Sequence, residues 1–172
     1  MKNSMKSAMA LICLPALSLP AMAANTKICF EAEKPASISA PLKKVSAGTS
    51  ASYSGDGYLE IPWNNNKDKG KGQAGFKFNA KKAGTYTLWA RTYWAQGCGN
   101  SISASVNGDA PATIGEDGTY GSWHWLRGPR VTVKAGANVL VMKNREEGIK
   151  VDQFFLCTDP NYVPTGLRKV TK

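Results

Sequence analysis

Short segments in which apolar and polar residues alternate make up most of this sequence, and they restrict the possible fold more than any other feature. A period of two is typical of a strand with one buried face. Clusters of Gly, Pro, Asn and Asp separate the segments at regular intervals, and no stretch has the period of an amphipathic helix. The predicted strands are Ile28–Glu33, Tyr58–Pro62, Ala74–Phe78, Thr85–Trp94, Ser101–Val106, Trp123–Arg127, Val131–Lys134, Val139–Lys143 and Lys150–Cys157. We therefore expect an all-β protein, a single-domain β-sandwich of the jelly-roll type.

The first residues have the pattern of a secretory signal peptide. Lys2 and Lys6 precede the apolar stretch Ala8–Leu19, and Ala21-Met-Ala23 provides small residues at the cleavage positions. The apolar stretch is shorter than the roughly 20 residues that cross a bilayer, so no membrane span is expected. The prediction is a signal peptide over residues 1–23 and a domain over 24–172, secreted to the periplasm or the extracellular space.

The chain is basic, with 22 Lys and Arg against 12 Asp and Glu and a formal net charge of +10. Such a charge attracts acidic polysaccharide, nucleic acid or anionic membrane, although a basic surface without a special partner is an equal alternative. Nucleic acid is disfavoured because the basic residues do not interleave with aromatic residues on one strand face. The run Lys67–Lys71 is Gly-rich and is expected to be a solvated loop.

Three cysteines follow the predicted cleavage point, namely Cys29, Cys98 and Cys157. In an oxidising compartment we expect one disulfide and one remaining thiol. Cys29 opens the first predicted strand and Cys157 closes the last, so antiparallel pairing of these strands would bring both to the same end. The preferred bond is Cys29–Cys157.

Carboxylates in the first and last predicted strands suggest a site for a hard cation. Glu31 and Glu33 lie two residues apart on one strand face, and Asp152 stands in the apolar strand Lys150–Cys157. A carboxylate in such a strand is costly unless something satisfies it. Calcium would suit these oxygens together with backbone carbonyls, and salt bridges to Lys27, Lys34 or Lys150 are the alternative. Alternation alone does not place Asp152 with both glutamates, so the cation site requires a bulge.

The order of these strands resembles the group of carbohydrate-binding modules that contains families six and thirty-five. The resemblance starts from Phe30–Glu33 and Gly148–Leu156, the opening and closing strands. The intervening matches are Gly57–Pro62, Ala83–Arg91, Asn100–Gly108 and Ala135–Leu140, so that the likeness covers roughly Ile28 to Val163.

The resemblance implies a structural calcium ion (Ca²⁺) held by Glu31, Glu33 and Asp152. It also implies a sugar site in loops at one end of the sandwich, with an aromatic residue from Tyr120–Trp125 and an asparagine before the last strand. Lys150 occupies that asparagine position. This departure favours a ligand that carries carboxylate or sulfate groups.

Sugars expose flat C–H faces that pack on aromatic rings, and their hydroxyl groups need amide or charged partners. Trp89 is expected in the core. Trp123 and Trp125 share one strand face, for which core packing is an equal alternative. The predicted ligand-binding residues are Tyr58, Trp94, Asn100, Tyr120, Trp123, Trp125, Arg145 and Lys150.

Enzyme chemistry has little support in the sequence. His124 is the one histidine, and no zinc site or catalytic triad is evident around it. The adjacent pairs Glu116-Asp117 and Glu146-Glu147 are expected in solvated turns. The predicted function is non-catalytic binding of a polysaccharide or glycan, with some preference for acidic ones. The alternatives are an adhesion or protein-interaction sandwich and a small polysaccharide lyase or hydrolase using Tyr120, His124 and Arg145; the oligomeric state is left open.

Overall fold

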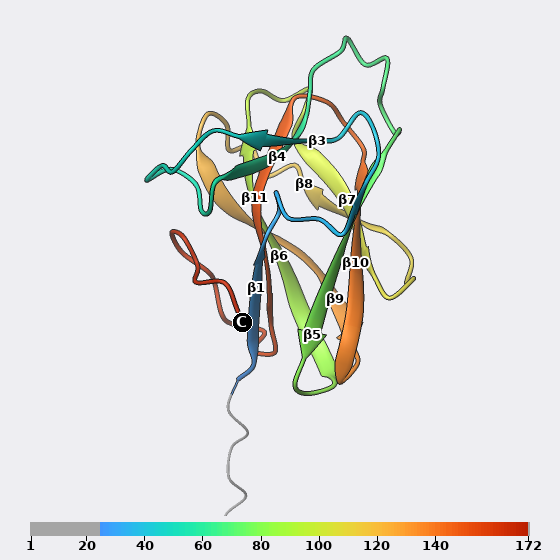
Figure 1. The fold of residues 1–172 in the computed structure, drawn as a ribbon, viewed down its shortest axis with the longest axis vertical. Coiled ribbons are helices and arrows are strands. Elements are labelled where there is room, and N and C mark those ends of the chain that lie inside the picture. Colours follow the sequence, from blue (N-terminus) through green and yellow to red (C-terminus); the bar gives the residue numbers. More distant parts are fainter. Residues whose placement is uncertain (1–24, 172) are drawn as a thin grey trace, which may run out of the picture.

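The computed structural model describes residues 25–171, which form eleven β-strands and no helix (Figure 1). The predicted signal peptide, residues 1–23, lies outside the described residues, and in the described part no helix is long and apolar enough to cross a membrane. The strands are β1 (Lys27–Glu31), β2 (Ser37–Ile38), β3 (Lys43–Ser46), β4 (Gly57–Ile61), β5 (Gln73–Ala80), β6 (Gly84–Trp94), β7 (Ser101–Val106), β8 (Ala112–Gly115), β9 (Trp123–Val133), β10 (Gly136–Asn144) and β11 (Ile149–Cys157).

Two antiparallel sheets pack face to face, which confirms the predicted β-sandwich. The six-stranded sheet has the order β3-β4-β11-β6-β9, with β1 paired to β11 as well. The five-stranded sheet has the order β2-β5-β10-β7-β8. Alternate residues of each strand meet between the sheets, where Leu59, Leu88, Leu140 and Phe154 are fully buried. Each such side chain contributes about 1.5–3 kcal/mol by leaving water.

A β-bulge interrupts β11 at Asp152, so the bulge considered in the sequence analysis is present. In the pairing with β6 the register shifts between Val151 and Gln153. Val151 and Phe154 both pack in the central core, so Asp152 and Gln153 lie between two inward-facing residues. Before the bulge β11 pairs with β4, and beyond it β11 pairs with β1. The extra residue therefore lets Asp152 depart from the strand's alternation.

The C-terminal segment, residues 158–171, packs back along β1 and the outer face of β11. Gln153 and Arg168 exchange two hydrogen bonds of 2.8 and 3.0 Å, and Thr171 exchanges two of 2.9 Å with Cys29. Residues 167–171 are therefore held against the sheet. The physical reason is that Phe155 and neighbouring side chains make this part of the sheet apolar, and the segment covers it.

The predicted Cys29–Cys157 disulfide is not formed, and all three cysteines in residues 25–171 are free. The two strands do pair, but Cys29 lies opposite Phe155 and Cys157 lies opposite Lys27. The two cysteines are thus diagonal neighbours, for which Cα atoms are about 7–8 Å apart. A disulfide joins Cα atoms about 4.4–6.8 Å apart. The prediction placed both residues at the correct end but in the wrong register.

Candidate functional site

Three carboxylates from β1, the turn after it and the β11 bulge lie together in what we call the carboxylate site, Glu31, Glu33 and Asp152. Glu31 is 7% exposed, Glu33 is 8% exposed and Asp152 is fully buried. Glu31 pairs with Gln153, directly beside Asp152 on β11. The structure therefore brings together all three residues that the sequence predicted for a cation.

The loop before β4 covers the carboxylate site. The Ser54 amide donates a 2.8 Å hydrogen bond to Asp152 Oδ1, and the Ser54 hydroxyl donates a 2.7 Å bond to Glu31 Oε1. Gly55 follows with a φ of +61°, and a Cβ atom there would lie 2.4 Å from Glu33 Oε1. Glycine is thus required both by the left-handed backbone and by the space that Glu33 occupies.

Asp152 has a buried cationic partner that the sequence analysis missed. Arg91 on β6 is buried, and its Nη1 lies 2.6 Å from Asp152 Oδ2. The alternative of a lysine salt bridge is wrong for the residues described, since none of Lys27, Lys34 and Lys150 pairs with a carboxylate. A buried arginine in the middle of an apolar strand such as Thr85–Trp94 was the signal that could have revealed this pair.

Two buried glutamates of the carboxylate site keep oxygens without hydrogen-bond partners. These atoms are Glu31 Oε2 and both carboxylate oxygens of Glu33. Burial raises the pKa of Glu33 to about 7, and the nearby charges of Glu31 and Asp152 act in the same direction. Burial also raises the pKa of Asp152 to about 6, although the bonds from Ser54 and Arg91 oppose the rise. The protein's own partners therefore do not fully stabilise the ionised carboxylates, which must take up protons or another cation.

The donors present suit a hard cation. No group of three or more His, Cys, Asp or Glu side chains within residues 25–171 is arranged to hold a metal by itself. A cation here would combine Glu31, Glu33 and Asp152 with backbone carbonyls or water, which is the mixed oxygen set that calcium accepts. The unpartnered oxygens of Glu31 and Glu33 are the atoms that such an ion would satisfy.

A second group, the aromatic cluster, consists of Tyr53, Tyr58, Tyr93 and Trp123. The ring of Trp123 lies 5.6 Å from Tyr93, 5.7 Å from Tyr58 and 6.3 Å from Tyr53 between centroids. Strand register explains the grouping, because Lys150 on β11 lies opposite Tyr93 on β6, which lies opposite Trp123 on β9. Three neighbouring strands thus contribute one transverse row of side chains.

Two cations lie against the aromatic cluster. Lys150 Nζ is 5.1 Å from the Tyr58 ring centroid and 5.3 Å from that of Tyr93. The Arg91 guanidinium carbon is 5.5 Å from the Trp123 ring centroid. Since Arg91 also binds Asp152, it connects the aromatic cluster to the carboxylate site. Lys150 has only cation–π contacts with the described residues, so its charge remains available to a ligand.

The remaining polar residues of the predicted ligand set form a separate tip cluster, Asn100, Tyr120 and Arg145. Asn100 Nδ2 lies 3.4 Å from the Tyr120 hydroxyl, and Tyr120 is 43% exposed. Arg145 lies 2.9 Å from Glu116 and 3.4 Å from Glu146, and it also donates to Ser101. Two carboxylates therefore balance the charge of Arg145.

Two predicted ligand-binding tryptophans lie outside the aromatic cluster. Trp94 is fully buried between the sheets, since the alternation of β6 directs it inward. Trp125 lies on the same side of β9 as Trp123, but the C-terminal segment covers it and its Nε1 donates a 2.8 Å bond to Gly166. Trp89 is buried as expected, although it packs with Phe155 under the C-terminal segment and not in the central core.

The sequence analysis missed two aromatic residues. Tyr53 belongs to the aromatic cluster, and its position in a small-residue loop gave no strand pattern from which to predict it. Trp63 follows β4 and is 45% exposed, with its Nε1 donating to Asn65. Its place between Pro62 and three asparagines is typical of a surface loop, and this signal could have identified it.

Glu147 is fully buried, so the prediction of a solvated Glu146-Glu147 turn is wrong for this residue. Its carboxylate accepts bonds of 2.7, 2.8 and 2.6 Å from the backbone amides of Asn64, Asn66 and Asp68. Burial opposes ionisation, but these three donors outweigh it and hold the pKa of Glu147 below its ordinary value. Glu147 thereby fixes the loop that contains Lys67–Lys71, so this loop is anchored from within.

His124 and the first acidic pair show no catalytic arrangement. His124 Nε2 lies 3.2 Å from Asp117, and its Nδ1 lies 3.0 Å from the Ser122 carbonyl. The Glu116 side chain is exposed, as expected for a turn. Tyr120, His124 and Arg145, the residues considered for a lyase, therefore have separate partners. His124 contacts Asp117, whereas Arg145 is bound to the carboxylates of Glu116 and Glu146.

No protein-family model matches the sequence, and no curated protein sequence matches it significantly. Solved structures do match its fold. A family 35 carbohydrate-binding module from Clostridium thermocellum has a TM-score of 0.56 and 22% identity, with 76% of this chain and 97% of that one covered. The CBM35 of Paenibacillus barcinonensis has a TM-score of 0.58 and 20% identity, with 76% and 98% covered.

A β-(1,4)-mannanase of Podospora anserina with a CBM35 in its name matches with a TM-score of 0.61 and 20% identity. The match covers 79% of this chain but only 28% of the mannanase. These likenesses establish that the chain has the β-sandwich fold of the family 35 modules.

Proposed function

We propose that this protein is a secreted, non-catalytic carbohydrate-binding protein that binds polysaccharide through the aromatic cluster and prefers acidic glycans. The observation that supports it is the transverse row Lys150–Tyr93–Trp123, with Tyr58 beside it. Rings from neighbouring strands offer stacking area for sugar faces, and Lys150 offers a charge next to that area. The structural likeness to family 35 carbohydrate-binding modules supports this ligand class.

Lys150 is the residue that would select an acidic sugar. Its ammonium group lies near two rings and has no carboxylate partner in the described residues. A uronate carboxylate or a sulfate stacked beside Tyr58 would therefore meet an uncompensated positive charge. Arg145 cannot add the same preference, because Glu116 and Glu146 already balance it. Asn100 and Tyr120 would add neutral hydrogen bonds to hydroxyl groups.

We further propose that the carboxylate site binds calcium as a structural ion. The unpartnered oxygens of Glu31 and Glu33 support this assignment. Such an ion would also stabilise the sugar site, because Ser54 binds the carboxylate site and Arg91 Nη1 donates a 3.0 Å bond to the Ser52 carbonyl. These contacts hold the loop that carries Tyr53 against Tyr58 and Trp123.

Affinity electrophoresis in gels with alginate, pectin, a sulfated galactan or neutral xylan tests the proposal. Trp123→Ala removes a stacking face and should reduce retardation by every polymer that binds. Lys150→Asn should weaken the acidic polymers selectively, whereas Lys44→Asn, at an exposed position on β3, makes the same charge change as a control. The charge effect should weaken with salt, since the Debye length is about 8 Å at 0.15 M ionic strength.

The outcomes separate the candidate functions. If no polymer retards the wild type, the carbohydrate proposal fails and the adhesion or protein-interaction alternative gains. If only xylan retards it, the binding function stands but the acidic preference is lost. Release of reducing ends or of unsaturated sugars from any of the polymers would instead support the enzyme alternative.

A further inference from the structure

The sandwich has an open side between the edges of β1 and β5, at the end opposite the aromatic cluster. One edge of β5 is fully paired with β10, but the other pairs with β2 only at Ala74 and Gly75. From Phe76 to Ala80 this second edge faces β1 without a strand partner in residues 25–171. Ile28 lies in register with Leu156 on β11 and Leu88 on β6, five residues from Tyr93, so the aromatic cluster lies about 17 Å farther along the strands at about 3.3 Å per residue.

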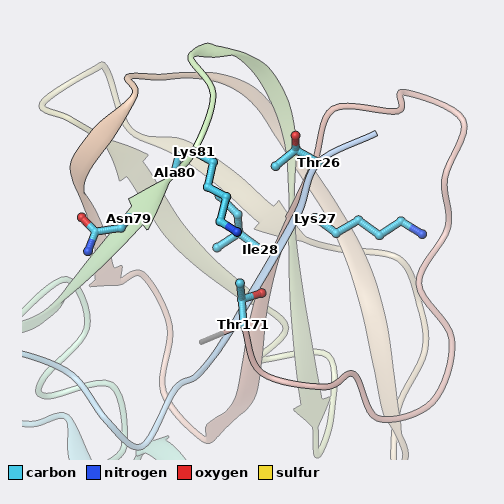
Figure 2. Close-up of a pocket in the computed structure, with 7 residues that line it drawn as sticks. All are labelled: Thr26, Lys27, Ile28, Asn79, Ala80, Lys81 and Thr171. Carbon is cyan, nitrogen blue, oxygen red and sulfur yellow. The ribbon is translucent and has the colours of Figure 1, made fainter. Parts of the chain in front are cut away.

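Three adjoining depressions, which we call the lateral groove, cross β5 at this place. The first, of about 260 Å³, lies between Thr26–Ile28 and Asn79–Lys81 (Figure 2). The second, of about 220 Å³, adds Phe30 and Phe78, whose rings stack at 5.6 Å. The third, of about 450 Å³, continues over the outer face of β5 to Ala137–Val139 of β10. Asn79 lines all three, so the depressions adjoin at this residue.

The polar side chains of the lateral groove are basic or neutral, and three of them are not used by the protein itself. Lys77, Asn79 and Lys81 are exposed and form no side-chain hydrogen bond or ion pair with the described residues. None of the residues that line the three depressions is acidic. Figure 2 shows Lys81 reaching toward Ile28, whereas Lys27 extends away, with its Nζ 3.8 Å from the Tyr162 ring centroid.

The direction of the lateral groove distinguishes between two kinds of extended ligand. A peptide that adds a strand to β5 must run along its free edge. The depressions instead run across β5, from β1 over Asn79 to Val139 on β10, which is 39% exposed. A glycan needs no strand edge, and it uses apolar surface for its C–H faces, an amide for hydroxyl groups and cations for its carboxylates.

We propose that the lateral groove is a second glycan-binding site, for an acidic polysaccharide strand that crosses β5 at Asn79. Lys77 and Lys81 bind the carboxylates on either side, Asn79 binds hydroxyl groups, and the exposed Ala137 and Val139 contact the sugar rings. The ligand class rests on the proposed function, but the site and its residues are independent of the aromatic cluster. Two sites at opposite ends would let one molecule join two polysaccharide chains.

Isothermal titration calorimetry of the full chain with galacturonate trisaccharide tests this proposal by stoichiometry. The wild type should bind two trisaccharides, and Trp123→Ala and Asn79→Asp should each retain one site. Asn79→Asp keeps the side-chain size and places a carboxylate between the two lysines. It should weaken the groove site at least about tenfold, or about 1.4 kcal/mol. Asn161→Asp, also exposed, is the matched control and should bind two.

Each outcome decides one site. A wild type that binds no trisaccharide overturns the second site, as does a single wild-type site that Trp123→Ala abolishes. Equal weakening by Asn161→Asp shows general charge repulsion and also overturns it. If Trp123→Ala binds like the wild type while Asn79→Asp binds nothing, the lateral groove stands and the aromatic cluster fails. Binding of an acidic peptide to the lateral groove, with no trisaccharide bound there, refutes the glycan assignment.

Discussion

Glu147 and the carboxylate site are two buried acidic regions near the same sheet, and they are satisfied to very different extents. Glu147 accepts three backbone hydrogen bonds, and its pKa lies below the ordinary value. Glu33 has no hydrogen-bond partner for either oxygen, and its pKa is raised to about 7. Both side chains are nearly or fully removed from water, so burial alone does not explain the difference.

This contrast separates a completed structural carboxylate from one that lacks a partner. Backbone amides supply fixed donors to Glu147, and the result is an anchored loop that needs nothing from solution. The carboxylate site has one guanidinium and one serine for three carboxylates. Its remaining charge is the physical reason to expect a cation, because buried charges without partners are costly.

The largest effect should come from removing the only cation that the carboxylate site already has. Arg91→Met leaves Asp152 buried without its partner, which typically costs about 3–5 kcal/mol of the free energy of unfolding. Urea denaturation monitored by tryptophan fluorescence gives this value. Arg130→Met, at an exposed position on β9, is the control and should cost under about 0.5 kcal/mol. A similar loss in both variants would show that the Arg91–Asp152 pair contributes little.

Calcium should stabilise the protein by a somewhat smaller amount. An ion that binds only the native state adds about 2.7 kcal/mol at 100 times its dissociation constant. For a domain of this size that is a rise of about 5–10 °C in melting temperature. Differential scanning calorimetry in chelator and in excess calcium measures the rise.

Glu33→Gln should abolish most of the calcium effect, because it removes a carboxylate with no other partner. Glu60→Gln should leave it intact, since Glu60 pairs with Lys43 at 3.0 Å outside the carboxylate site. Identical melting temperatures in chelator and calcium would remove the cation from the proposal.

Glu147→Gln should lower the melting temperature by a smaller amount, because the amide oxygen of glutamine still accepts some of the hydrogen bonds from the loop amides. A carboxyl whose pKa is lowered by folding stabilises the native state above its ordinary pKa, about 4.3, and loses that contribution as the pH falls. The variant should therefore melt below the wild type at neutral pH and approach it in acid. Calcium should not change the difference. A difference that persists unchanged in acid would mean that ionised Glu147 is not what fixes the loop.

The smallest expected difference in stability is between two glycine variants. Gly55 and Gly118 both have positive φ, +61° and +77°, but only Gly55 has a neighbour within 4 Å. Alanine in the left-handed region costs roughly 1–2 kcal/mol at either position. Gly55→Ala should cost more than Gly118→Ala, and it should also weaken calcium binding because its Cβ displaces Glu33. Equal melting temperatures and equal calcium responses would contradict the described packing.

The sequence predicted the fold and part of the site because both depend on local patterns. Alternation and Gly-rich breaks identified the strands, and the three carboxylates at the ends of the domain did converge. Lys150 and Trp123 lie on either side of Tyr93 in one row across β11, β6 and β9. These residues follow from strand order, which the resemblance supplied.

The errors came from contacts that strand patterns do not encode. Glu147 is buried because a loop about 80 residues earlier in the chain wraps around it. Trp125 and Trp123 have the same sequence pattern, and only the packing of the C-terminal segment distinguishes them. The strand register explains why Cys29 and Cys157 form no disulfide. Their strands pair as predicted, but a two-residue offset separates the two cysteines.

The place of β11 determines when the protein can fold during synthesis. β11 is the last strand in the sequence, yet it lies in the interior of the six-stranded sheet, with β6 on one side and β4 and β1 on the other. Until Cys157 has left the ribosome, β11 is incomplete, so no strand connects β1 and β4 to β6. Folding therefore waits for nearly the whole chain, and the closing step joins residues more than a hundred positions apart. Such long-range pairing is typical of all-β domains that fold in milliseconds to seconds.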